Sequence, residues 1–259
     1  LEQLERAAQL PDDHRYLLIE ELGRGGMGRV WLAEKLGPNG EPFCTVVLKT
    51  ILLPHGAASD DIQRRKDMFM REMAVAAKLR HPNIIRFHAL GELPDGALAM
   101  VMEYVHGESL AARMRRGPMP LPLVRHVVTE VAAALDHAHA RGIVHRDLKP
   151  ENVLVSPREG RALPDVKVVD FGLAKEGALG ARVDIALRGE ILGTPRYMSP
   201  EQLCGVSVDA RADVYALGSV LFRLLTGRNV FETEHVIALL GRLVLEDPPR
   251  PSQFRFDIP

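Results

Sequence analysis

Hydrophobic and β-branched residues in the first third of the chain recur in short runs bounded by turn residues, which is the pattern of β-strands. Five such strands are predicted, over residues 16–22, 29–33, 43–50, 84–90 and 97–103. Between the third and fourth strands, Asp60 is a suitable N-cap for a helix with Phe69 and Met73 on its buried face. The pattern therefore predicts a five-stranded antiparallel sheet with one helix.

From residue 109 onward the apolar positions follow the helical period. Seven of them share one face of a predicted helix that Gly142 would end, namely Val124, Val127, Val128, Val131, Ala132, Leu135 and Ala138. Short strands at 153–155 and 166–169 precede a second helix at 213–226, which is apolar nearly all round and is therefore expected in a domain centre. The fold class is α+β: a small antiparallel β lobe with one helix, then a larger, mainly α lobe.

Composition narrows the class of protein. The 259 residues are 46% hydrophobic and 26% charged, as in ordinary globular proteins, and the net charge of -1 with no run of like charges disfavours nucleic acid or an anionic membrane as partner. Cys44 and Cys204 fit no metal spacing and are too few for a disulfide framework, which predicts a cytoplasmic location. The most apolar stretch, 214–225, is too short to cross a bilayer, although an anchor outside this sequence stays open.

A glycine-rich segment follows the first predicted strand. Gly23, Gly25, Gly28 and Val30 match G-x-G-x-x-G-x-V, a pattern that ordinary turns also produce. A dinucleotide-binding fingerprint would need a helix after the third glycine, whereas residues 30–32 read as a strand. The alternative to an ordinary turn is a strand–loop–strand flap whose backbone closes over a triphosphate.

Lys49 ends the third predicted strand and has two interpretations. It is either an exposed edge lysine, the usual situation of this residue type, or the partner of a buried carboxylate. Glu72 supports the second interpretation because it lies on the apolar side of the predicted helix, where an unpaired carboxylate is costly.

The most specific signal is the order of residues in the middle of the chain. Residues 145–152 read His-Arg-Asp-Leu-Lys-Pro-Glu-Asn, which fits H-R-D-L-x-x-x-N at every specified position, and Asp-Phe-Gly follows at 170–172. From about residue 16 onward the chain thus resembles the catalytic domain of a Ser/Thr protein kinase. The amino-acid sequence at 25–28, 197–202 and 213–218 is most similar to that of the bacterial eukaryotic-like (Hanks-type) subgroup.

The resemblance implies transfer of the γ-phosphate of ATP, with Mg²⁺, to Ser/Thr hydroxyls of a protein substrate, including autophosphorylation. Asp147 would accept the hydroxyl proton, Lys149 would lie by the γ-phosphate, and Glu72 would pair with Lys49. Asn152 and Asp170 would hold the metal. The nucleotide-binding set would be Gly23, Gly25, Gly26, Gly28, Val30, Val47 (where Ala is usual), Lys49, the gatekeeper Met102, the hinge residues Glu103 and Val105, and Leu154 under the adenine.

Two further resemblances indicate a Ser/Thr protein kinase. Lys149 stands two residues after Asp147, and residues 193–201 are similar to a substrate-docking segment in which Thr194 would bond Asp147 and Lys149. The alternatives are a pseudokinase acting as an ATP-binding scaffold, favoured by loss of a catalytic residue, and a small-molecule phosphotransferase, which would lack the docking segment.

The expected organisation is an N-terminal extension at 1–15, a kinase N-lobe with hinge at 16–105, and a C-lobe at 106–259. The last helices of that lobe, with the family's arginine partner for Glu201, are expected beyond residue 259. Between residues 173 and 193 no Ser, Thr or Tyr is present, so Glu190 either stands in for a phosphorylated residue by pairing with Arg146 or is a solvated loop charge. The oligomeric state is not indicated.

Overall fold

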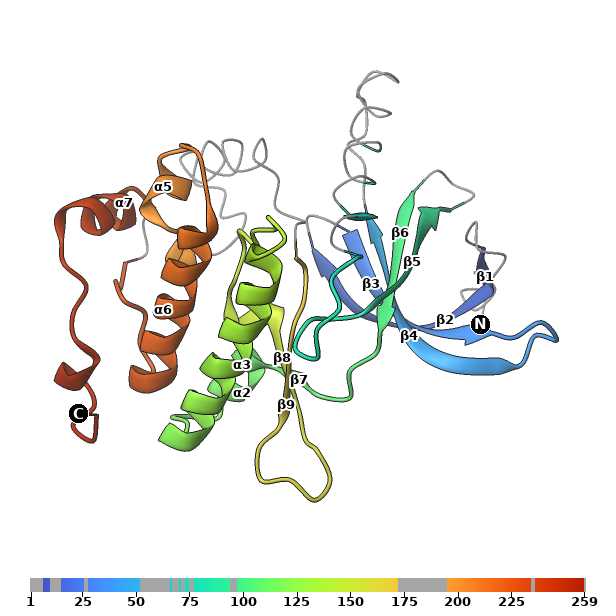
Figure 1. The fold of residues 1–259 in the computed structure, drawn as a ribbon, viewed down its shortest axis with the longest axis horizontal. Coiled ribbons are helices and arrows are strands. Elements are labelled where there is room, and N and C mark those ends of the chain that lie inside the picture. Colours follow the sequence, from blue (N-terminus) through green and yellow to red (C-terminus); the bar gives the residue numbers. More distant parts are fainter. Residues whose placement is uncertain are drawn as a thin grey trace. The chain divides into compact units, whose positions relative to one another are not determined.

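A computed structural model of the chain describes residues 7–9, 15–25, 28–51, 66, 70, 73–74, 77–93, 97–171, 195–233 and 236–258. The chain divides into two compact units, Leu1–Arg80 with Ile85–Val105, and His81–Ile84 with His106–Pro259. Each unit is described by itself below, with the element labels of Figure 1.

The first unit is an antiparallel sheet in the order β1-β2-β3-β4-β6-β5. Its strands are β1 (Ala7–Gln9), β2 (Arg15–Gly25), β3 (Gly28–Leu36), β4 (Pro42–Ile51), β5 (Phe87–Glu92) and β6 (Leu98–Glu103). Alternate residues of four strands form its core, including the fully buried Tyr16, Ala33, Leu48 and Val101. This core sets the register that places the glycine-rich hairpin and Lys49.

All five predicted strands are present, and the sheet has a sixth, β1, because this part of the polar lead-in pairs with β2. The predicted strand at 84–90 begins only at Phe87. Ile84 instead forms an isolated β-bridge with Val168, and both residues belong to the second unit. Of the predicted helix after Asp60, the described residues 66, 70, 73 and 74 are helical. Ala77 lies in the turn that follows, and the remaining positions lie outside the described part.

The second unit contains the helices α2, α3, α5, α6 and α7 and a small antiparallel sheet, β7-β8-β9 (Figure 1). Its elements are β7 (Glu108–Ser109), α2 (Leu110–Met114), α3 (Leu121–His139), η1 (Pro150–Asn152), β8 (Val153–Ser156), β9 (Asp165–Val168), η2 (Pro195–Tyr197), α5 (Pro200–Leu203), α6 (Ala210–Thr226), α7 (Val236–Leu245) and η3 (Pro251–Gln253). Helix α3 packs against α6. No helix in the described ranges is long and apolar enough to span a membrane.

The helix ends follow local rules. In α3 five of the seven predicted positions are buried, whereas Val128 is half-buried and Ala132 is exposed. Gly142 beyond the end of the helix has φ 72°, a conformation that favours glycine. Helix α6 starts three residues earlier than predicted because the Asp209 side chain accepts a hydrogen bond from the Arg211 N–H. It is also less uniformly buried than predicted, since Val214 is 63% exposed.

Candidate active site

The glycine-rich segment is a hairpin between two strands. Strands β2 and β3 pair up to Gly25 opposite Gly28, and Gly28 has φ 145°. Gly26 lies outside the described residues. Because β3 begins at the third glycine of the motif, the geometry excludes the helix that a dinucleotide-binding fingerprint requires at this point.

Lys49 lies on β4, opposite Val30 of β3 and Met100 of β6. The strand is interior to the sheet and Lys49 is only 9% exposed, so the interpretation as an exposed edge lysine was wrong. Glu72, its expected partner, lies outside the described residues.

The predicted hinge follows β6. Met102 is buried opposite Val47 on β4. Glu103 is tied to Arg86 twice, since its N–H donates to the Arg86 carbonyl (2.9 Å) and its Oε1 accepts from the Arg86 N–H (2.7 Å). These two bonds fix the backbone where the first unit ends at Val105.

Three of the predicted site residues meet in the second unit: the catalytic Asp147 and Lys149 and the metal-binding Asn152. The Lys149 Nζ lies 2.8 Å from Asp147 Oδ2. The Asn152 side-chain amide donates to the Asp147 carbonyl oxygen (2.8 Å) and to Oδ2 (3.3 Å). Since the side chains of Asp147 and Lys149 are each 21% exposed, the pair is held in place and still open to a reacting group.

Asp213 of α6, which the sequence analysis did not single out as functional, binds the backbone of the catalytic loop at residues 145 and 146. Its carboxylate, 1% exposed, accepts hydrogen bonds from the backbone N–H groups of His145 and Arg146 (both 2.8 Å) and from His139 Nε2 (2.7 Å). Arg146 has φ 66°, a strained value for a residue with a side chain. Buried anionic oxygens that bind successive N–H groups offset such strain. The sequence feature that could have indicated this role is that Asp213 is the one carboxylate in a mostly apolar helix.

His145 joins the catalytic loop to the segment that carries Asp170. Its Nδ1 accepts from the Asp147 N–H (3.3 Å), so its Nε2 is the nitrogen that donates to the Val169 carbonyl (2.9 Å). The ring is fully buried against Phe171, with centroids 4.7 Å apart. The Val169 N–H in turn donates to the Asn152 carbonyl (2.9 Å). The two predicted metal-binding residues, Asn152 and Asp170, are therefore connected through one backbone hydrogen bond and one residue.

The substrate-docking segment is described from Pro195 onward, so Thr194 and Glu190 lie outside the described residues. Ser199 and Gln202 form a capping box at the start of α5, which gives Ser199 a local role where the family more often has alanine. The Gln202 amide also donates to the Arg146 carbonyl (2.8 Å). Sequence reasoning missed this second support of the catalytic loop.

Tyr197 of the same segment is buried, and its hydroxyl accepts a hydrogen bond from Arg223 Nη1 (2.5 Å). Burial raises the pKa of Tyr197, while the neighbouring Arg223 guanidinium partly opposes the shift. The bond fastens the docking segment to helix α6.

The comparison with known families agrees with this geometry. The family pattern described as "Protein kinase domain" matches residues 16–245. The chain belongs to the protein kinase family. Its fold is that of bacterial kinases: a crystal structure of a mutant PknI kinase domain from Mycobacterium tuberculosis has a TM-score of 0.66 at 33% identity, with 93% of this chain and 82% of that chain covered.

Curated relatives are also kinases. The chain is 40% identical over 247 residues to serine/threonine-protein kinase pkn3 of Myxococcus xanthus, with 94% of this chain and 43% of that protein covered. It is 35% identical over 257 residues to tyrosine-protein kinase MasK of the same species, with 94% and 38% covered. The chain thus spans less than half the length of these relatives. Membership of the family implies ATP as phosphoryl donor, a protein as acceptor and typically a divalent metal ion.

Proposed function

We propose that this chain is the catalytic domain of a Ser/Thr protein kinase, which transfers the γ-phosphate of Mg-ATP to Ser/Thr hydroxyls of a protein and also phosphorylates itself. The observation that carries the proposal is the arrangement of Lys149 and Asn152 around Asp147, with contacts of 2.8 and 3.3 Å to Oδ2. In this role Asp147 takes the proton of the acceptor hydroxyl, and the Lys149 ammonium offsets negative charge as it develops on the transferred group.

Asn152 and Asp170 are the residues that would hold Mg²⁺. Amide and carboxylate oxygens are donors that Mg²⁺ accepts, and the Asn152 amide nitrogen is engaged with Asp147, which leaves Oδ1 as the ligand atom. The metal would neutralise phosphate charge. The hydrogen bonds from Asn152 and Val169 keep these ligand-bearing segments together.

The proposed nucleotide-binding residues are those that the resemblance to protein kinases implies. Gly23, Gly25, Gly26 and Gly28 would form the flap, and Lys49, with Glu72 as its expected partner, would face the phosphates. The adenine set comprises Val30, Val47, Met102, Glu103, Val105 and Leu154. We assign residues 16–105 to the N-lobe with hinge and 106–259 to the C-lobe of a cytoplasmic protein. The pseudokinase alternative lacks support, since Lys49, Asp147, Asn152 and Asp170 are all present.

The test is ATP-dependent labelling of the purified chain and of a generic protein acceptor, with and without Mg²⁺. Wild type is expected to label both, whereas Asp147→Asn is expected to label neither and to keep its circular dichroism spectrum. Asp257→Asn, a surface carboxylate paired with Arg255 (2.7 Å), is the matched control and should label normally. Labelling by Asp147→Asn at the wild-type rate would refute the proposal.

A further inference from the structure

A groove in the second unit carries an excess of positive charge that the catalytic site does not use. It has a volume of about 310 Å³ and lies between α2, the start of α3 and the connection between β8 and β9. Four of its lining residues are arginines, at positions 113, 116, 158 and 161, and Glu108 is its one lining carboxylate. We call it the arginine groove.

Two of these guanidinium groups are available for a ligand. Arg116 is paired with Glu108 (2.8 Å) and Arg158 with Asp165 (3.1 Å). Within the described part of the chain, the guanidinium groups of Arg113 and Arg161 make no hydrogen bond or ion pair. Because a guanidinium presents parallel N–H donors that match a carboxylate, this pair suits an acidic ligand.

The other lining residues of the groove, apart from Glu108, are apolar. Its remaining lining residues are Met119, Leu123, Val155, Pro157, Ala162 and Pro164. An aliphatic side chain fits such a surface, while bases of a nucleic acid stack on aromatic rings, which this lining lacks. The combination of aliphatic and arginine lining residues therefore favours a peptide that carries both acidic and aliphatic residues.

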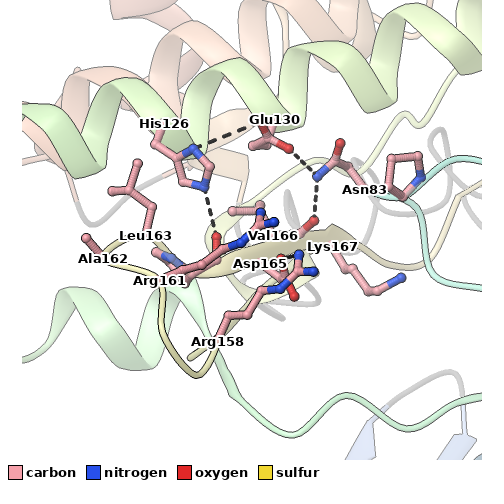
Figure 2. A pocket seen from close by; sticks show the side chains of 12 residues that line it. Asn83, His126, Glu130, Arg158, Arg161, Ala162, Leu163, Asp165, Val166 and Lys167 are labelled. Carbon is pink, nitrogen blue, oxygen red and sulfur yellow. Dashed lines mark hydrogen bonds and ion pairs between the residues drawn. The ribbon is translucent and has the colours of Figure 1, made fainter.

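The β8–β9 connection, which forms one wall of the arginine groove, is held against α3. Figure 2 shows these contacts in a neighbouring pocket, which shares Arg158, Arg161, Ala162 and Pro164 with the groove. His126 Nε2 lies 2.8 Å from the Pro164 carbonyl, and the Asn83 amide donates both to Glu130 Oε2 (2.6 Å) and to the Val166 carbonyl (2.9 Å). Since these bonds fix the wall before a ligand arrives, binding does not have to order it.

The groove lies at the turn end of the β8–β9 hairpin, whereas Asn152 and Asp170 lie at its other end. Each strand is four residues long, a separation of roughly 13 Å. We propose that the arginine groove docks an acidic segment with aliphatic residues in the protein substrate, away from the phosphorylated hydroxyl. This inference rests on the proposed kinase function.

Binding is tested by fluorescence anisotropy with labelled synthetic peptides of Glu, Asp and Leu. Controls replace either Leu by Ser or the acids by Lys. Arg113→Glu combined with Arg161→Glu should weaken binding of the first peptide by about tenfold or more. The matched control combines Arg125→Glu and Arg250→Glu, two exposed arginines outside the lining, and should bind like wild type.

Four outcomes would overturn the proposal: unchanged binding by the groove variant, an equal loss in the control variant, equal binding of the Leu→Ser peptide, or tighter binding of a single-stranded oligonucleotide or of phosphatidylserine vesicles. A kinetic arm compares a short acceptor peptide with the same acceptor joined to the acidic segment. In the wild type the joined acceptor should have a lower KM than the short acceptor. In the groove variant this difference in KM should disappear, while kcat and the KM of the short acceptor stay unchanged. If no version phosphorylates the short acceptor, the proposed function fails, while the anisotropy result still decides the groove.

Discussion

The backbone N–H of Arg146 donates a 2.8 Å hydrogen bond to Oδ1 of Asp213, although the two residues are 67 positions apart. Because Arg146 directly precedes Asp147, this bond helps to set the direction in which the candidate base points. It connects the strained φ of Arg146 to a buried charge in α6.

Asp213→Asn is expected to loosen the catalytic loop, because the amide presents a single acceptor oxygen to donors that now share a full carboxylate. Loss of hydrogen bonds to a charged group costs about 1.5–3 kcal/mol of unfolding free energy. Displacement of Asp147 should lower kcat by about 100-fold. Thermal melts and labelling rates measure the two effects. Asp209→Asn, which keeps a good N-cap on the same helix, should change neither.

Lys49→Ala should lower kcat/KM by about 100- to 1,000-fold, since it removes a positive charge proposed to face the phosphates. The sheet should survive, so the far-ultraviolet circular dichroism is expected to match wild type. Lys35→Ala, on the neighbouring strand β3, is the control and should retain activity. A Lys49→Ala enzyme as fast as wild type would remove this residue from the proposed site.

Phosphoamino acid analysis of labelled acceptor should give phosphoserine or phosphothreonine. The reason is Lys149, which lies 2.8 Å from the candidate base, together with the docking segment. The test matters because one relative, MasK, is named a tyrosine-protein kinase at 35% identity. Phosphotyrosine as the main product would contradict the proposed acceptor class.

Gly107→Ala should destabilise the second unit by about 1–3 kcal/mol, because an added Cβ would overlap the Val155 carbonyl oxygen across the β7–β8 pair. Gly218→Ala, inside helix α6 with open space around the new Cβ, should stabilise it by about 0.5–1 kcal/mol. Chemical denaturation measures both. Equal melting of the two variants would show that the close approach at Gly107 is absent.

Stability should fall as the pH drops below about 6.5, in part through His81. Burial, followed by the charge of His137, lowers the pKa of His81 from 6.5. The unfolded chain therefore takes up this proton at a higher pH than the folded chain, so acid favours unfolding and neutral pH does not. Melting of His81→Gln between about pH 7.5 and 5.5 should show a smaller decrease than wild type. An unchanged decrease would assign the effect to other groups.

The ordered catalytic motif was predictable because its residues lie within eight positions, where local backbone geometry already brings Asp147, Lys149 and Asn152 together. The positions of strands β2, β3, β4 and β6 were predictable for another local reason, since short apolar runs bounded by turn residues mark them in the sequence. The long helices were predictable because their apolar positions recur with the helical period.

What the sequence did not indicate depends on contacts between distant segments. Asp213 looks like one polar residue in an apolar helix until the His145 N–H reaches it from 68 residues away. The arginine groove likewise combines Arg113 from α2 with Arg161 from the β8–β9 connection. The strand β1 was missed because its pairing with β2, rather than its composition, makes it a strand.

The amides of Val168 and Val169 donate to the carbonyls of Asn83 and Asn152, on opposite sides of β9. Deuterium uptake at these neighbouring positions would therefore separate two events. Faster exchange at Val168 alone would report loss of the hydrogen bond between β9 and Asn83. Faster exchange at Val169 alone would report release of the catalytic loop at Asn152. A single proteolytic peptide thus contains one isotopic probe for each side.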